Sequence, residues 1–424
     1  MTISKKIFII ACEPSADGHG ASLVKELKRL APESTFRGLG GPLMAQAGVS
    51  LIEDMTKISA LGFGDVLRQY FRYRKIFYNA LREANSFKPD AVILIDSPAF
   101  NLRFAKKINR RFPVIYYIAP QIWAWGGQRI HTIKKFVSKM ITILPFEKKI
   151  YDDAGVPCDF VGHPLLDHLG ERSRQKIQLR KDLEITDQEL AIGLLPGSRA
   201  SEVKRILPEM LRAADLIKQK FPQASFFLTE SPNVPKEVYA NILSHHSSSP
   251  HGVRRGSQIL DSRLKSCGND KIFIRRMRSR MQDVVAAMDF ALIASGTATL
   301  EAALLGTPFF LLYKASVSTY WLGRLLIKVK FLGMVNLLAG RAVVPEFIQG
   351  EMRGDVIAAA ATEFLSNQVG QIEVMKNDFA AVTAKVGNSG ASRRAAESII
   401  SFLSQNAPTQ IQAGQQAHSA QEKG

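Results

Sequence analysis

One local pattern recurs along this chain: a short apolar run ends in a turn of small residues and leads into a helix. The clearest case is residues 289–294, which are followed by Ser295, Gly296 and Thr297 and then by apolar residues at helical spacing up to Gly306. Short apolar runs bounded by turn residues are typical of buried parallel strands. Strands that alternate with helices predict an α/β fold with doubly wound sheets, in which ligands bind where the strands end.

The turn at Ser295 predicts a phosphate site. A helix that begins at Thr297 presents free N–H groups and about half a positive charge, and both favour a phosphate. Glu301, one turn into the helix, is a candidate for the diol of a ribose. The alternative is an ordinary N-cap followed by a solvated glutamate.

A second turn of this kind follows the apolar run at 190–195 and comprises Gly197, Ser198 and Arg199. The glycine allows a ligand to approach the backbone closely, and the arginine can bind a phosphate. Two such turns in one doubly wound domain can hold one diphosphate, and this pairing favours the phosphate interpretation of both.

The first half of the chain has apolar runs at 6–11 and 91–95. Glu13, Ser15 and Asp17 follow the first run and are candidates for ligand contact, with ordinary loop polarity as the alternative. Asp96 follows the second run directly. Partial burial at such a position raises the basicity of a carboxylate, which suits a general base. The alternative is that Asp96 caps the next helix.

The length of 424 residues predicts two domains, because one ordinary core does not extend that far. We expect a first domain at 1–166, a charged helical linker that opens a second domain at 167–388, a helix at 389–404 and a disordered tail at 405–424. The three cysteines lack metal-ligand spacing, which indicates a reducing compartment and neither a zinc site nor a disulfide framework.

The net charge of +18, from 56 basic and 38 acidic residues, predicts a polyanionic partner. Nucleic acid is not expected, because no nucleic-acid motif is present and aromatic residues do not interleave with the basic clusters. Residues 63–87 and 320–334 mix basic residues with aromatic or aliphatic ones and predict attachment to an anionic membrane surface, the alternatives being a solvated helix face and a core segment. Residues 244–280 supply many arginines and predict a surface insertion.

A set of short motifs runs along the chain: Glu13-Pro-Ser-Ala-Asp17, Gly38-Leu-Gly-Gly-Pro42, Ile95-Asp-Ser-Pro-Ala-Phe-Asn101, Trp123-Ala-Trp125, Pro145-Phe-Glu147, Val161-Gly-His-Pro164, Leu194-Leu-Pro-Gly-Ser-Arg199, Ser295-Gly-Thr-Ala-Thr-Leu-Glu301 and Asn336-Leu-Leu-Ala-Gly-Arg341. Taken in order, this set resembles the lipid-A-disaccharide synthase family, GT-B-type glycosyltransferases of the lipopolysaccharide pathway. The set covers nearly all of the chain to about residue 404, and its order makes it specific. The family usually has glycine where Cys12 and Ala16 stand and an acidic residue where Ala99 stands.

The resemblance implies two Rossmann-like domains facing each other across a cleft, with the helix at 389–404 returning to the first. It implies inverting transfer of 2,3-diacylglucosamine from its UDP derivative to 2,3-diacylglucosamine 1-phosphate, giving a β-1,6-linked disaccharide 1-phosphate and UDP. Asp96 matches the residue that is the suspected general base of this family. Arg199 and a helix dipole can replace a metal, so no metal or other cofactor is expected. The candidates for the acceptor or the cleft are Glu13, Ser15, Asp17, Asn101, Asn336 and Arg341.

The resemblance further implies a cytoplasmic protein on the cytoplasmic face of the inner membrane, and a homodimer is compatible with the sequence. Two alternatives stay open. A sugar-nucleotide epimerase of the same fold would keep the diphosphate site but need several acid/base groups and no lipid surface. A non-catalytic binder of anionic lipid or RNA would explain the charge but not the paired turns.

Overall fold

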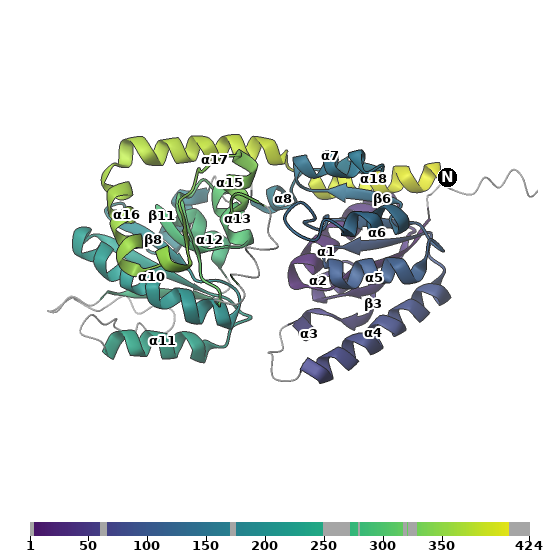
Figure 1. Cartoon of the computed structure of the whole chain (residues 1–424), viewed down its shortest axis with the longest axis horizontal. Coiled ribbons are helices and arrows are strands. Elements are labelled where there is room, and N and C mark those ends of the chain that lie inside the picture. The colour runs from purple at the N-terminus through teal and green to yellow at the C-terminus, as the bar shows by residue number, and fades with distance from the viewer. Residues whose placement is uncertain are drawn as a thin grey trace, which may run out of the picture. The chain divides into compact units, whose positions relative to one another are not determined.

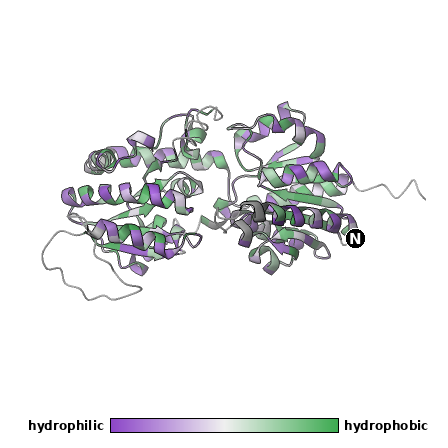
Figure 2. Ribbon diagram, turned by 60° about the horizontal axis from the view of Figure 1, so that its bottom comes forward, coloured by the Kyte–Doolittle hydropathy of each residue, from purple (hydrophilic) through white to green (hydrophobic). Residues whose placement is uncertain are grey.

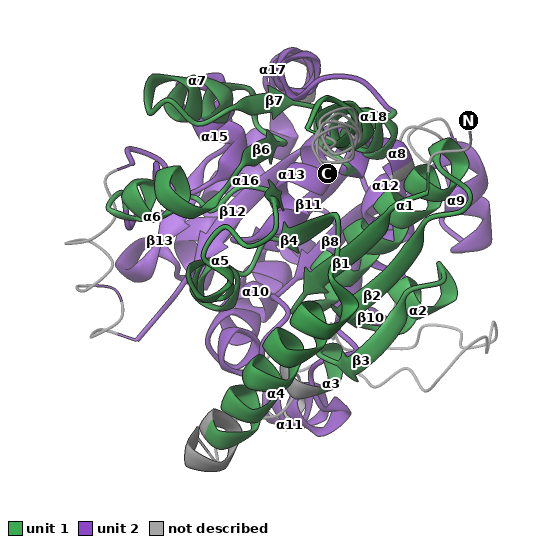
Figure 3. Ribbon diagram, turned by 90° about the vertical axis from the view of Figure 1, so that its right-hand side faces the viewer, with its two compact units in different colours: residues 1–122, 127–164, 390–424 green, residues 123–126, 165–389 purple. Residues whose placement is uncertain are grey.

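The computed structural model describes residues 4–59, 66–169, 175–248, 272–278, 280–316, 320 and 329–406. The chain divides into two compact units (Figure 3). Unit 1 comprises residues up to Ile122, Gly127–Pro164 and the residues from Gly390 onward, and unit 2 comprises Trp123–Gly126 and Leu165–Ser389. Each unit is built on its own parallel β-sheet (Figure 1).

Unit 1 has a seven-stranded sheet in the order β3-β2-β1-β4-β5-β6-β7. Its strands are β1 (Lys6–Ala11), β2 (Thr35–Gly40), β3 (Ser50–Asp54), β4 (Ala91–Ile95), β5 (Val114–Tyr117), β6 (Lys139–Thr142) and β7 (Cys158–Phe160). Its helices are α1 (Pro14–Leu30), α2 (Pro42–Gln46), α3 (Thr56–Ser59), α4 (Val66–Phe87), α5 (Pro98–Ile108), α6 (Arg129–Phe136), α7 (Pro145–Asp153) and α18 (Ala391–Gln405). Since β1 and β4 lie side by side at the centre, the strand order reverses between them.

The two faces of this sheet are covered differently (Figure 3). Helices α1 and α18 pack together on one face, and α4, α5 and α6 cover the other. The second face is rich in aromatic rings: Phe77 of α4 meets Phe100 of α5 edge-on at 5.2 Å between ring centroids, and Phe8 of β1 stacks on Phe104 at 6.1 Å. Helix α18 is fixed by Arg394, whose Nε donates to the carbonyl of Val161 at 2.8 Å.

Unit 2 has a six-stranded sheet in the order β10-β9-β8-β11-β12-β13. Its strands are β8 (Leu190–Leu195), β9 (Ala224–Glu230), β10 (Ile274–Arg278), β11 (Phe290–Ala294), β12 (Phe309–Tyr313) and β13 (Glu346–Ile348). Its α-helices are α8 (Leu165–Leu169), α9 (Lys176–Asp182), α10 (Ala200–Lys220), α11 (Lys236–Ser248), α12 (Met281–Ala287), α13 (Thr297–Leu304), α15 (Met334–Ala339), α16 (Gly354–Ser366) and α17 (Glu373–Val386). In both units the strands are largely hydrophobic and the helices carry polar outer stripes (Figure 2).

The segment expected to open the second domain as a linker is fixed to the sheet of unit 2. Arg180 of α9 donates from Nη1 to both carboxylate oxygens of Asp289, at 3.0 and 2.9 Å. Asp289 also accepts from the N–H of Ala191 at 2.9 Å. Helix α9 is therefore anchored at the amino end of the two central strands, β8 and β11.

The prediction of a surface insertion at 244–280 is wrong for the two ends of this segment that the structure describes. Residues up to Ser248 continue α11, and 274–278 form β10, which pairs in parallel with β9 at the edge of the sheet. An edge strand has one unpaired side and tolerates charge, so β10 lacks the apolar run of a central strand. Residues 63–65 of the expected first membrane segment, 249–271 and 279 of the expected insertion, 321–328 of the expected second membrane segment and 407–424 of the expected tail lie outside the described residues.

Candidate active site

The candidate residues of unit 1 leave the sheet at its central strands. Ala11 of β1 pairs with Ile95 of β4, so Glu13 and Asp96 emerge side by side at the carboxyl edge. The strand order reverses at this point. In doubly wound sheets, ligands bind in the crevice outside the carboxyl ends of the strands at such a reversal. The topology thus places Asp96 at the edge position that the fold uses for ligands.

The backbone of Asp96 adopts an unusual conformation. Asp96 and Ser97 have φ angles of 50° and 43°, which is the left-handed region. Such a conformation costs on the order of 1–3 kcal/mol per residue and persists only where the surroundings hold it. The Asp96 carbonyl accepts hydrogen bonds from Tyr116 Oη at 2.5 Å and Asn101 Nδ2 at 2.7 Å. Tyr116 and Asn101 therefore fix the direction in which Asp96 leaves the strand.

The environment of the Asp96 carboxylate suits proton acceptance. Burial, together with the negative charge of Glu13, raises the pKa of Asp96, and a hydrogen bond from the Ser97 N–H offsets part of this effect. The N-cap of α5 is Ser97, so Asp96 precedes the cap position. The local environment of Asp96 therefore suits a general base, and this role stays a prediction.

Two other candidates of unit 1 use their polar atoms inside the domain. The Asp17 side chain is 2% exposed. Its carboxylate accepts from the N–H groups of Gly41 at 2.7 Å, Met44 at 3.0 Å and Leu43 at 3.1 Å, which satisfies the start of α2. Asn101 is fully buried and holds Asp96. Asp17 and Asn101 thus shape the edge, whereas Glu13 and Ser15 are exposed at the start of α1.

The candidate donor residues of unit 2 also lie at a reversal of strand order. Leu195 of β8 pairs with Ile293 of β11. The turn at 196–199 and the turn at 295–297 therefore leave adjacent strand ends on the same edge. This is the arrangement that the paired-turn prediction requires for one diphosphate, although the binding itself stays a prediction.

The turn before α13 is open. Gly296 is exposed, and a Cβ placed on it would meet no heavy atom of the described residues within 4 Å. Thr299 Oγ1 donates to the Gly296 carbonyl at 2.7 Å, which tightens the first turn of the helix. Glu301 is largely buried and accepts a hydrogen bond from Gln282 Nε2 of α12 at 3.2 Å.

The turn before α10 is occupied by a residue that sequence reasoning missed, Glu202. Its Oε2 accepts from the N–H groups of Ser198 at 3.1 Å and Arg199 at 3.2 Å. Its Oε1 accepts from Arg199 Nη1 at 3.1 Å. The available signal was a glutamate three residues after the N-cap position, which is half of a capping box.

The candidates near the end of unit 2 have partners there. Asn336 is buried, and its Nδ2 donates to the Val344 carbonyl and to Glu346 Oε1, both at 2.8 Å. Its Oδ1 accepts from the N–H groups of Val343 and Val344. Arg341 is exposed and forms an ion pair with Asp378 of α17. Asn336 therefore fixes the approach to β13, and a ligand would have to compete with Asp378 for Arg341.

Over the described parts of the chain, no group of three or more His, Cys, Asp or Glu side chains could hold a metal ion. Cys12, where the resembled family usually has glycine, is buried beside Asp96. Burial, then Glu13 and Asp96, raises the pKa of Cys12 above its ordinary range, which keeps the thiol protonated. Ala16 is also buried, whereas Ala99 is exposed on the first turn of α5.

A family model described as lipid-A-disaccharide synthetase matches residues 7–251 and 254–399. The chain belongs to this family. It is 36% identical over 409 residues to lipid-A-disaccharide synthase of Myxococcus xanthus (strain DK1622), covering 95% of the chain and 99% of the relative. It is 36% identical over 394 residues to lipid-A-disaccharide synthase 1 of Legionella pneumophila (strain Lens), covering 92% and 96%. The predicted family and enzyme class, a hexosyltransferase, are confirmed.

Solved structures share the fold at low sequence identity. UDP-GlcNAc 2-epimerase from Neisseria meningitidis bound to UDP-GlcNAc superposes with a TM-score of 0.61 at 15% identity, covering 94% of this chain and 99% of that one. MurG of Acinetobacter baumannii gives a TM-score of 0.54 at 13% identity, with 94% and 99% covered. The predicted α/β fold with two Rossmann-like domains of the GT-B class is confirmed. The epimerase alternative is not favoured, because its likeness is one of fold alone.

Proposed function

We propose that this protein transfers 2,3-diacylglucosamine from its UDP derivative to 2,3-diacylglucosamine 1-phosphate. The products are the β-1,6-linked disaccharide 1-phosphate and UDP. The observation that carries the proposal is the shared placement of candidate residues. In each unit these residues follow the strands at which the strand order reverses. Unit 1 has the carboxylate of Asp96 there, and unit 2 has the two turns that precede α10 and α13.

Asp96 acts as the general base in this proposal. The carboxylate takes the proton from the 6-hydroxyl of the acceptor while that oxygen attacks the anomeric carbon of the donor. The bond from the anomeric carbon to the diphosphate breaks, and its electron pair leaves with UDP. Because the attack comes from the side opposite the leaving group, the configuration at the anomeric carbon inverts. The raised pKa of Asp96 makes it a stronger proton acceptor than an ordinary aspartate.

The turns of unit 2 act on the leaving group. Negative charge grows on the diphosphate as the bond breaks, and in this proposal N–H groups at the starts of α10 and α13 stabilise that charge. Arg199 adds a full positive charge at the first of these starts. Glu301 is assigned to the ribose of UDP, where Gln282 would share its carboxylate.

The direct test is mass spectrometry of the products formed from UDP-2,3-diacylglucosamine and 2,3-diacylglucosamine 1-phosphate. We expect the disaccharide 1-phosphate and an equal amount of UDP. Conversion of the UDP-sugar to an epimer without acceptor would instead support the epimerase alternative. Binding of either lipid without formation of any product would support a non-catalytic binder.

The outer surface of unit 1 supports a second element of the proposal, attachment to the anionic cytoplasmic face of the inner membrane. Phe71 and Tyr78 of α4 are 57% and 51% exposed. The exposed basic residues around them on α4 are Arg72, Arg74, Lys75 and Arg82. This mixture of exposed rings and positive charges is typical of helices that bind membrane interfaces. Across the described residues, no helix has both the length and the apolar character needed to cross a membrane.

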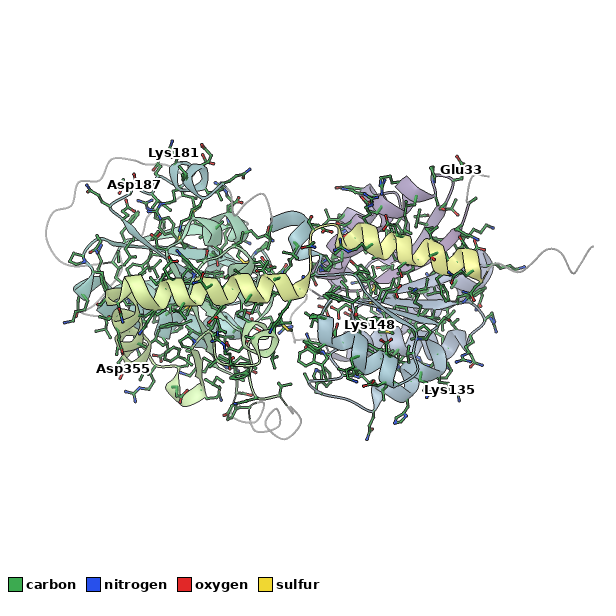
Figure 4. All side chains as sticks on the ribbon, turned by 90° about the horizontal axis from the view of Figure 1, so that it is seen from above. Glu33, Lys135, Lys148, Lys181, Asp187 and Asp355 are labelled. Carbon is green, nitrogen blue, oxygen red and sulfur yellow. The ribbon has the colours of Figure 1, made fainter. Side chains whose placement is uncertain are left out.

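The basic surface continues beyond α4. Helix α5 contacts both α4 and α6, and neither α5 nor α6 contains an acidic residue. The exposed basic residues on and after these helices are Arg103, Lys106, Lys107, Arg110, Arg111, Lys134 and Lys135, the last of which is labelled in Figure 4. Tyr73 of α4 packs against the hydrophobic cluster that contains Cys12, which directly precedes Glu13 at the carboxyl edge. Burial, followed by Cys12 and Glu13, also raises the pKa of Tyr73. In this proposal the membrane-bound acceptor approaches Asp96 along this surface.

We expect the protein to sediment with vesicles that contain anionic lipid, and to sediment less as salt is raised, because salt screens exposed charges. Phe71→Ser combined with Arg74→Glu should reduce the bound fraction. Lys25→Glu, a charge reversal at an exposed position of α1 on the other face of the sheet, is the matched control. Wild-type protein that stays in the supernatant at low salt would contradict membrane attachment.

A further inference from the structure

At the start of α10, the N–H groups bind a carboxylate of the protein itself, that of Glu202. We propose that Glu202 competes with the diphosphate of the donor for this site and thereby sets how tightly UDP is held. The inference rests on the proposed function, which assigns the diphosphate to this turn. It adds that the Glu202 carboxylate must move away when the donor binds and can return when UDP leaves.

The hydrogen bonds carry the first step. Both the Ser198 and the Arg199 N–H groups donate to Glu202 Oε2, and the Arg199 guanidinium donates to Oε1. These three donors lie at the start of a 21-residue helix, where the dipole favours a negative charge. Backbone N–H groups and arginine at a helix start are also what binds a phosphate. An N–H makes one good hydrogen bond at a time, so the carboxylate and a phosphate exclude each other.

Gly197 gives an independent indication that the turn is shaped around Glu202. Its φ is +112°, which strongly favours glycine. A Cβ placed on Gly197 would lie 2.6 Å from Glu202 Oε2 and 3.0 Å from Glu202 Cβ. The space that the missing side chain leaves is therefore filled by the glutamate, whereas the sequence pattern predicts an approaching phosphate there.

The two turns of unit 2 differ in this respect. At the start of α13, no heavy atom of the described residues lies near the space above Gly296, and Glu301 is held one turn further along by Gln282. At the start of α10, the Glu202 carboxylate accepts hydrogen bonds from the donors that a phosphate would use. The space beside Gly296 is thus open over the described residues, whereas the N–H groups of the α10 turn become available only when Glu202 moves. This asymmetry limits donor affinity and favours release of the UDP product.

The test is UDP binding by calorimetry for Glu202→Gln, which keeps the shape and removes the charge. A carboxylate about 4 Å from a phosphate in a partly exposed site opposes binding, so we expect UDP to bind roughly 5- to 30-fold more tightly. In steady-state assays the KM for the donor should fall and inhibition by UDP should strengthen, without a gain in kcat. Glu237→Gln, the same charge change at an exposed position of α11, should leave UDP affinity unchanged.

A second variant, Glu202→Ala, removes the carboxylate and also any hydrogen bond that glutamine would retain. Thermal melting of this variant shows whether the loss of the cap has unfolded α10. Folded Gln and Ala variants that both bind UDP as weakly as wild type, or more weakly, would overturn the inference. If wild type binds UDP and Arg199→Ala weakens it in the same experiments, the proposed function survives that result. A wild-type protein that does not bind UDP would instead remove the donor site on which the inference rests.

Discussion

Asp96→Asn should lower turnover by about 100- to 10,000-fold, the usual contribution of a general base, while UDP binds as in wild type. Asparagine keeps the size of the side chain and can still accept the hydrogen bond from the Ser97 N–H, but it cannot take up a proton. Because proton removal occurs only in the transition state, the loss appears in kcat far more than in donor affinity. Single-turnover rates with saturating donor and calorimetry with UDP measure the two effects separately.

Asp90→Asn is the matched control for this experiment. Asp90 lies just before β4 at the opposite end of the same strand, where its Oδ2 accepts from the Lys6 N–H at 2.7 Å. The control removes the same charge from unit 1 without touching the carboxyl edge. A folded Asp96→Asn protein that turns over within a few-fold of wild type would reduce Asp96 to a structural residue.

The pH profile offers a second readout of the same role. Only the deprotonated carboxylate can accept the proton, so the rate should fall as the pH falls through the pKa of Asp96. Burial and Glu13 raise that pKa above its model-peptide value of about 3.9. The acidic limb of kcat/KM should therefore lie at a higher pH than an ordinary aspartate would give, and it should be absent from the residual activity of Asp96→Asn.

The positions of the central strands could be predicted from the sequence because burial on both faces leaves a strong local signal. The apolar runs at 6–11, 91–95, 190–195 and 289–294 correspond to β1, β4, β8 and β11. The turns that follow them were visible as well, since small and polar residues interrupt each run. The order of the strands had no such signal, because pairing joins segments that are far apart in the chain. Only the structure shows that β1 adjoins β4 and that β8 adjoins β11.

The orientation of polar side chains was the harder part of the candidate site. Asp17 and Asn336 stand in motifs that suggested ligand contact, and both are buried with their oxygens hydrogen-bonded to backbone N–H groups. Asp17 bonds to Gly41, 24 residues away, so no local pattern could reveal the contact. Buried backbone groups require partners, and a side chain that supplies one resembles a ligand-binding residue in a single sequence. Glu202 was missed for the opposite reason, because its local capping pattern looked ordinary.

Arg199→Ala should weaken UDP binding by roughly 1.5–3 kcal/mol, the range for a hydrogen bond to a charged group, which corresponds to about 10- to 150-fold in Kd. The Arg199 side chain is 77% exposed, so a ligand at the start of α10 can reach it once Glu202, its hydrogen-bonded partner, moves aside. Removing it takes away the full positive charge and leaves the Glu202 carboxylate without its counter-charge. Both changes oppose a diphosphate. Calorimetric titration with UDP measures the loss directly.

Arg205→Ala is the matched control, because Arg205 lies on the same helix, is exposed and carries the same charge. A general effect of net charge would weaken UDP binding equally in both variants, whereas a specific contact would weaken it only in Arg199→Ala. Combining Arg199→Ala with Glu202→Gln separates the two contributions further. If Glu202 competes for the site, the double variant should bind UDP more tightly than Arg199→Ala alone, since no carboxylate then occupies the N–H groups of the turn. Unchanged UDP affinity in Arg199→Ala would show that the diphosphate does not bind at this turn.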